Sequence, residues 1–362
     1  MKNLCTSCFL FLFILSFPLL GAAQKTFSGK GSVGYQTHYG TFLTHSPKAA
    51  YLRDSYSSYH ELYYQQQTDG SKPWHVANKL PQWGVALFWG NTGSRQYIGN
   101  MAGAFGFMNV PLLKKKRFTS KLRGGMGLGW VQKPYNKNTN HKNVLLGSPV
   151  NGFVSFLWQN ELKLAPQLFV NAGFSFSHLS NGGSTLPNLG LNIPAVSVGI
   201  RYGADNAPTT TTVEKRKADK IKYTLFASGG IKQAPWVESS RYLVNTISAE
   251  GSKQLGYSSK VSGGVILFYD RSLQVHPAGI PSLKRKGNFL QAGVFAAYEH
   301  GFGKVSVPLQ LGAYVYNKDL APQLFQNLGL RYKMSSHWST QVILKTHMGQ
   351  ADHVHVGVGY QF

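Results

Sequence analysis

Apolar and polar residues alternate along most of this chain, in runs of roughly ten residues. The last run, 353–362, reads His-Val-His-Val-Gly-Val-Gly-Tyr-Gln-Phe, with valine, tyrosine and phenylalanine at every even position. Because successive side chains of a strand point to opposite faces, this run has one apolar face and one polar face. Turn residues separate such runs, whose length suits tilted strands that cross a lipid bilayer.

The alternation predicts about sixteen antiparallel strands. An even number returns both ends of the chain to the periplasmic side, as in bacterial outer-membrane barrels. The expected strands lie near 29–44, 56–68, 82–91, 96–110, 118–132, 151–163, 167–180, 191–203, 222–234, 240–252, 257–270, 287–299, 303–317, 323–334, 337–348 and 351–362.

A polar stretch at 204–221 divides these strands into two sets of eight. It is predicted to be a linker or a long periplasmic turn. The pattern is compatible with one barrel of about sixteen strands, or with an eight-stranded barrel at 24–203 followed by a second eight-stranded unit at 222–362. We expect one barrel, because only the final strand ends in a terminal aromatic residue, Phe362. That ending resembles the signal by which outer-membrane barrels are recognised for insertion.

The first residues predict export from the cytoplasm. Lys2 precedes an apolar run, and the small residues Gly-Ala-Ala end at position 23, so 1–23 is expected to be a cleaved signal peptide. Both cysteines, Cys5 and Cys8, lie inside that segment. The mature chain is therefore expected to contain no disulfide and no thiolate metal site.

Charge and composition narrow the class of partner. The formal net charge is +24, which favours anionic partners, but Lys and Arg are scattered over loops and strand ends instead of forming a nucleic-acid-binding module. A phosphate-bearing lipid surface fits an exported chain better. Forty glycines, 13% aromatic residues and a mean hydropathy of −0.18 argue against a helical membrane bundle and suit a β-barrel. No motif indicates a cofactor or a metal ion.

One hairpin, 168–203, carries the candidate chemistry. His178 and Ser180 continue the apolar face of its first strand, and a register that pairs 178 with 192 would bring Asn192 beside His178. A serine becomes an effective nucleophile when a base lies next to it, and a third group normally orients that base. The pattern therefore suggests Ser180 as nucleophile, His178 as general base and Asn192 as the orienting group.

The tip of the same hairpin supplies hydrogen-bond donors for an oxyanion. The backbone N–H groups of Asn181, Gly182 and Gly183 and the side-chain amide of Asn188 are the candidates. Glycine permits a close approach of the backbone, and amide donors aimed at a developing negative charge are the usual device in acyl transfer.

These residues resemble a known family. His-Leu-Ser-Asn-Gly-Gly at 178–183, followed by Pro-Asn-Leu-Gly-Leu-Asn at 187–192, is similar to the active-site hairpin of the outer-membrane lipid A 3-O-deacylases and of their longer relatives, the acyloxyacyl hydrolases. The likeness extends upstream through Gly-Thr-Phe-Leu at 40–43, Pro-Gln-Trp-Gly at 81–84 and Gly-Met-Gly-Leu-Gly at 125–129. From 222 onward only a general barrel pattern is visible.

The resemblance implies an outer-membrane esterase that removes an ester-linked fatty acyl chain from lipid A of lipopolysaccharide. It gives His178 the role of base, Ser180 that of nucleophile and Asn188 that of an oxyanion donor. Familiar members of the family have a glutamate where this chain has Asn192. Two other functions stay open: a non-catalytic barrel such as a pore or an assembly component, and a phospholipase or acyltransferase that uses the same residues.

Overall fold

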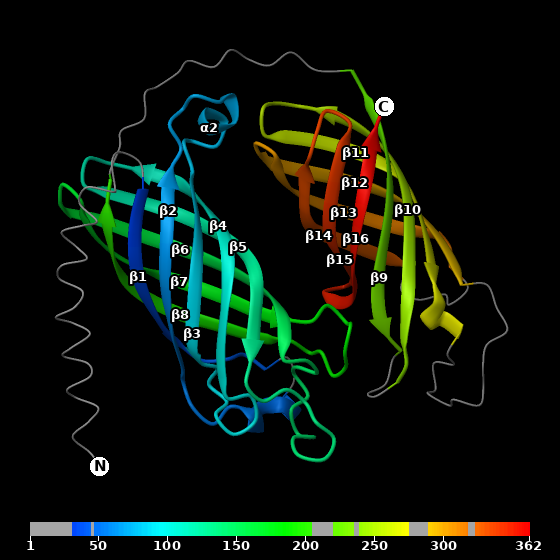
Figure 1. Cartoon of the computed structure of the whole chain (residues 1–362), viewed down its shortest axis with the longest axis horizontal. Helices are drawn as coiled ribbons and strands as arrows, with labels where there is room; N and C mark the ends of the chain where they lie inside the picture. The colour runs from blue at the N-terminus through cyan, green and yellow to red at the C-terminus, as the bar shows by residue number, and fades with distance from the viewer. Residues whose placement is uncertain (1–30, 45–46, 205–219, 235–238, 275–288, 318–322) are drawn as a thin grey trace.

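In a computed structural model, nearly all the regular secondary structure of the described residues is β-strand (Figure 1). The structure describes residues 31–44, 47–204, 220–234, 239–274, 289–317 and 323–362. The expected signal peptide at 1–23 and most of the expected linker at 204–221 lie outside these ranges. Among the described residues, no helix is long and apolar enough to span a membrane.

Eight antiparallel strands close the first barrel, because β1 pairs with both β2 and β8. A 3-10 helix, η1 (Pro47–Leu52), follows β1, and a short helix, α2 (Pro73–Ala77), joins β2 to β3. The strands are β1 (Gly31–Gly40), β2 (Ser57–Gln67), β3 (Gln82–Asn91), β4 (Asn100–Lys114), β5 (Phe118–Val131), β6 (Val150–Ala165), β7 (Leu168–Ser180) and β8 (Leu191–Gly203).

Eight further strands close a second barrel, in which β9 pairs with both β10 and β16. A 3-10 helix, η2 (Arg271–Gln274), follows β11. The strands are β9 (Lys222–Gln233), β10 (Arg241–Gln254), β11 (Ser259–Asp270), β12 (Leu290–Phe302), β13 (Val305–Tyr316), β14 (Leu324–Lys333), β15 (Trp338–His347) and β16 (Gln350–Gln361).

The sixteen antiparallel strands confirm the predicted fold class and strand number. The expectation of a single large barrel is wrong, and the arrangement of two eight-stranded barrels is the one observed. The physical reason is pairing: β8 returns to β1 along nine residue pairs, so no free edge remains there to continue into β9. A terminal aromatic on the last strand alone does not distinguish one barrel from two in tandem.

Both walls follow the expected alternation, with apolar side chains outside and polar ones inside. On β16, Val356 and Val358 are exposed, whereas His353 and His355 are buried in the interior. Such a wall suits lipid outside and a polar interior.

Charged side chains form ion pairs inside both barrels. In the first barrel Arg123 pairs with Glu61, and in the second Arg331 pairs with both Glu250 and Glu299. All five side chains are less than a tenth exposed. Buried charges are tolerated when they are paired and hydrogen-bonded, so these ion pairs form part of each barrel core.

The lengths of the connections distinguish the two ends of the first barrel. At one end, the turns 115–117 and 166–167 are short, as periplasmic turns usually are, and only 68–81 is longer, whereas 132–149 at the other end is long. We therefore call the end that carries 132–149 and 181–190 the outer end. We call the opposite end the periplasmic end. The two barrels touch there, because Asn78 Nδ2 donates to Ser258 Oγ at 2.7 Å and Asn78 Oδ1 lies 2.7 Å from His300 Nε2.

Candidate active site

Strands β7 and β8 form the hairpin that carries the candidate residues. Their register pairs His178 with Asn192, as the sequence pattern predicts. The even-numbered residues of β7, including Phe174 and Phe176, are the exposed ones, while Ser175 and Ser177 are buried inside the barrel. His178 and Ser180 therefore both lie on the lipid-facing side of the barrel wall. They are close to the outer end of the barrel, where β7 ends.

His178 and Asn192 are in direct contact. Nδ1 of the imidazole lies 2.6 Å from Oδ1 of the Asn192 amide. Because a carbonyl oxygen can only accept, Nδ1 carries the proton in this pair, and Nε2 is then the ring nitrogen that carries the lone pair. The backbone of Asn192 is itself held, since the Leu43 N–H donates to its carbonyl oxygen at 2.8 Å.

Ser180 lies between His178 and the turn. Its partner across the ladder on β6 is Gly152, an exposed glycine that has no side chain to cover the hydroxyl from that strand. The partner of His178 on the same strand is Val154. Base and hydroxyl thus share one face of β7.

Gly190 lies next to the imidazole ring of His178. It has a φ of +78°, in the left-handed region that favours glycine, and its N–H donates to the carbonyl oxygen of Leu145 at 3.0 Å. A Cβ placed on Gly190 would lie 2.7 Å from Cε1 of His178. The absence of a side chain at this position therefore leaves room for the ring.

The side chain of Asn181 organises the turn. Its Oδ1 accepts from the N–H groups of Gly183, at 3.1 Å, and Thr185, at 3.3 Å, and its Nδ2 donates to the Thr185 carbonyl at 2.7 Å. This is the Asx-type bonding by which asparagine stabilises turns. Asn-Gly is a standard turn signal, but the bonds of the Asn181 side chain within the turn were not predicted from the sequence.

The expected oxyanion donors are partly engaged within the turn. The Asn181 N–H donates to Oδ1 of Asn188 at 3.0 Å, and the Gly183 N–H donates to Asn181 Oδ1. The first contact orients the Asn188 amide so that its carbonyl oxygen is occupied and its NH₂ group stays available as a donor. The oxyanion roles of Asn181, Gly182 and Asn188 stay predictions.

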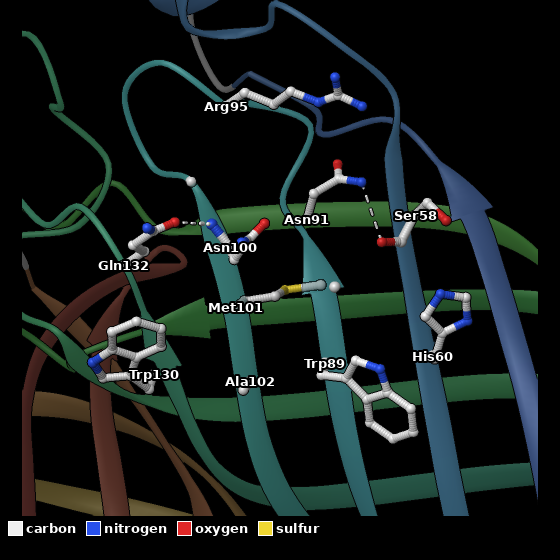
Figure 2. A pocket seen from close by; sticks show the side chains of 12 residues that line it. Ser58, His60, Trp89, Asn91, Arg95, Asn100, Met101, Ala102, Trp130 and Gln132 are labelled. Carbon is white, nitrogen blue, oxygen red and sulfur yellow. Dashed lines mark hydrogen bonds between the residues drawn. The ribbon is translucent and has the colours of Figure 1, made fainter. Parts of the chain in front are cut away.

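A pocket with no reacting residue lies elsewhere on the first barrel. It is an open pocket of about 770 Å³ at the outer end of β2–β5, between Trp89 and Trp130, with Ala102 between them and Arg95 above (Figure 2). None of the candidate reacting residues lines it. We place the candidate chemistry at the hairpin, because a nucleophile and a base lie there and not in this pocket.

Within the described ranges, no group of three or more His, Cys, Asp or Glu side chains is arranged to hold a metal ion. His353 and His355 lie inside the second barrel, with ring centroids 5.5 Å apart.

Comparison with protein families links both barrels to one enzyme family. The model described as lipid A 3-O-deacylase (PagL) matches residues 58–201, and the model described as acyloxyacyl hydrolase, C-terminal domain, matches 221–362. The first match includes the hairpin with His178, Ser180 and Asn192. No curated protein sequence matches the chain.

Comparison with solved structures finds matches at low sequence identity. Neisserial surface protein A is 8% identical, with a TM-score of 0.34, and the match covers 49% of this chain and 99% of that one. The Acinetobacter baumannii outer membrane protein Omp33 is 7% identical, with a TM-score of 0.19, and the match covers 92% of this chain and 98% of that one.

The two family matches together cover most of the chain and agree with the observed division into two barrels. The family and the apolar outer walls assign the protein to the outer membrane. This chain belongs to the lipid A 3-O-deacylase family, in a form that carries the acyloxyacyl hydrolase C-terminal domain.

Proposed function

We propose that this protein is an esterase that removes an ester-linked fatty acyl chain from lipid A in the outer leaflet. The observation that carries the proposal is the contact between His178 and Asn192 on the lipid-facing side of the hairpin, with Ser180 on the same side. A base that is oriented by a third group, beside a hydroxyl, is the arrangement that acyl transfer through serine requires.

In the proposed reaction, Ser180 Oγ attacks the acyl carbonyl while His178 Nε2 takes the hydroxyl proton. The tetrahedral intermediate collapses, the C–O bond to the sugar breaks, and His178 returns the proton to the leaving sugar oxygen. Water then attacks the acyl-serine with His178 again as the base, which releases the fatty acid and restores Ser180. The NH₂ group of Asn188 and the Gly182 N–H would stabilise the oxyanion in both steps.

The position of the site favours a lipid substrate. His178 and Ser180 continue a stripe that includes the exposed side chains of Phe174 and Phe176, so an acyl chain lying along the wall reaches them without leaving the bilayer. Polar groups are costly deep in hydrocarbon, and these two lie near the outer end of β7, at the headgroup level where ester bonds occur.

A pore is the less favoured alternative. The charged side chains inside the barrels are paired, and Arg123 and Arg201 in the first barrel are about 1% exposed. A water-filled channel would leave such side chains accessible to solvent. A phospholipase or acyltransferase would use the same groups on another lipid, and substrate choice would then depend on the shape of the lipid site.

Mass spectrometry of lipid A from cells that express the wild type, Ser180→Ala or His178→Ala tests the proposal. We expect the wild type alone to remove an acyl chain. The matched control is Ser177→Ala, which removes a buried hydroxyl from the inner face of the same strand. Intact lipid A in cells with folded, inserted wild-type protein would refute the esterase function, and loss of phospholipid acyl chains instead would favour the phospholipase.

A further inference from the structure

We infer that the second barrel positions the catalytic turn 181–190 of the first, through Gln233 at the end of β9 and Arg241 at the start of β10. This inference rests on the proposed function, because it concerns the turn that would hold the oxyanion donors. It gives the second barrel a part in the reaction carried out at the first.

Gln233 holds the turn at two points. Its side-chain Oε1 accepts from the Leu186 N–H at 2.6 Å, and its backbone N–H donates to the Gly183 carbonyl oxygen at 3.2 Å. Gln233 is 6% exposed, and its Nε2 donates to the Ser239 carbonyl at 3.2 Å, which fixes the amide. A buried side chain held at both ends is a rigid support for the backbone bonded to it.

Arg241 and β16 add further contacts on the same side. Nη2 of Arg241 donates to Thr185 Oγ1 at 3.0 Å. The start of β16 packs so closely that a Cβ on Gly182 would collide with the Val354 side chain. A Cβ on Gly183 would likewise collide with the carbonyl oxygen of Asp352.

From the first barrel, the Leu145 carbonyl bonds to the Gly190 N–H at the far end of the turn, and Gly147 packs against the backbone of Leu186. Residues 183–186, in the middle, carry hydrogen bonds to the second barrel. The same residues Gly183 and Thr185 bond to the Asn181 side chain, and the Asn181 N–H bonds to Asn188. A shift of residues 183–186 would therefore move the proposed oxyanion donors away from Ser180.

Displacement of a catalytic group by about 1 Å can cost about a hundredfold in rate. The loss would appear in kcat, because the oxyanion exists only in the transition state and the intermediate that follows. An apolar acyl-binding surface on the outer wall would be unchanged, so KM would change little. A lower kcat with an unchanged KM therefore distinguishes displaced oxyanion donors from a general weakening of the fold.

The test compares full-length Gln233→Ala, Gln233→Glu and Asn78→Ala with the wild type. Gln233→Ala removes the acceptor for Leu186. Gln233→Glu keeps an acceptor oxygen for Leu186 but loses the bond to the Ser239 carbonyl, so it is a partial rescue. Asn78→Ala is the matched control, because it breaks the contact between barrels at the periplasmic end without touching the turn. Turnover of lipid A in detergent and hydrogen exchange of the turn amides are measured for each.

We expect Gln233→Ala to lower kcat ten- to a hundredfold, to leave KM within about twofold and to speed exchange of the Leu186 amide. Gln233→Glu should lie between Gln233→Ala and the wild type in kcat, and Asn78→Ala should be unchanged. The inference is overturned if kcat of Gln233→Ala stays within twofold of the wild type, or if Asn78→Ala lowers kcat equally. If the wild type itself is inactive, the proposed function fails, and unchanged amide exchange in Gln233→Ala would separately disprove the support of the turn.

Discussion

His178 and Asn192 face each other across the β7–β8 ladder, with Nδ1 and Oδ1 2.6 Å apart. The amide oxygen can fix the tautomer of the imidazole, but it brings no negative charge to balance the imidazolium that forms when Ser180 is deprotonated. The pair therefore orients the base with less electrostatic stabilisation than a carboxylate would give.

Asn192→Asp should raise turnover. A carboxylate of the same length accepts from the same Nδ1–H and stabilises the imidazolium, so we expect kcat on lipid A to rise about tenfold, or ~1.4 kcal/mol in the barrier. Asn192→Ala should lower kcat by a comparable factor, because the ring loses its orienting contact. Steady-state turnover in detergent measures both, and wild-type kcat in Asn192→Ala would show that this residue does not orient His178.

Gly190→Ala should displace the imidazole. The new Cβ would lie 2.7 Å from His178 Cε1, at a φ of +78°, so we expect kcat to fall about a hundredfold while the barrel still forms. Gly349→Ala is the matched control: Gly349 has a φ of +84°, but no atom lies within 4 Å of the added Cβ. An equal loss of activity in both variants would attribute the effect to backbone strain and not to contact with His178.

Acid should loosen an outer loop of the first barrel through Asp54. Burial disfavours the charged carboxylate, but the N–H groups of Gln96 and Arg95, each donating at 2.8 Å, outweigh it and hold the pKa of Asp54 below its ordinary value of 3.8. Since the folded pKa is the lower one, the stabilisation is complete above about pH 4 and is lost as the pH falls through the folded pKa.

Hydrogen exchange of the Arg95 and Gln96 amides, corrected for the intrinsic rate, measures this loss. We expect protection to fall below about pH 4 in the wild type and to be weaker but independent of pH in Asp54→Asn, which keeps one acceptor oxygen. The same acid dependence in both proteins would assign the loosening to another group.

Local alternation was enough to predict sixteen strands and the pairing of 178 with 192, because the side-chain period of two fixes which face each residue takes. It could not predict how the strands close, since β8–β1 pairing joins residues far apart in the chain and depends on no local signal. Local alternation could not predict the contacts of Gln233 and Arg241 with the turn 181–190 either, because these contacts join the two barrels. Asn181 and Gly190 were visible as turn residues, but their partners within the turn were not.

Arg123 should be essential to the stability of the first barrel. Its guanidinium pairs with Glu61, which also lies 3.5 Å from His38, and all three residues are at most 2% exposed. Arg123→Met leaves the carboxylate buried without its main partner, so we expect the free energy of unfolding in detergent to fall by about 3–5 kcal/mol. Arg123→Met combined with Glu61→Gln should recover part of that loss, because no unpaired charge then remains inside. Urea unfolding followed by tryptophan fluorescence measures all three proteins, and a double variant less stable than Arg123→Met would show that the cost comes from lost packing against Tyr63 and Phe107 rather than from the charge.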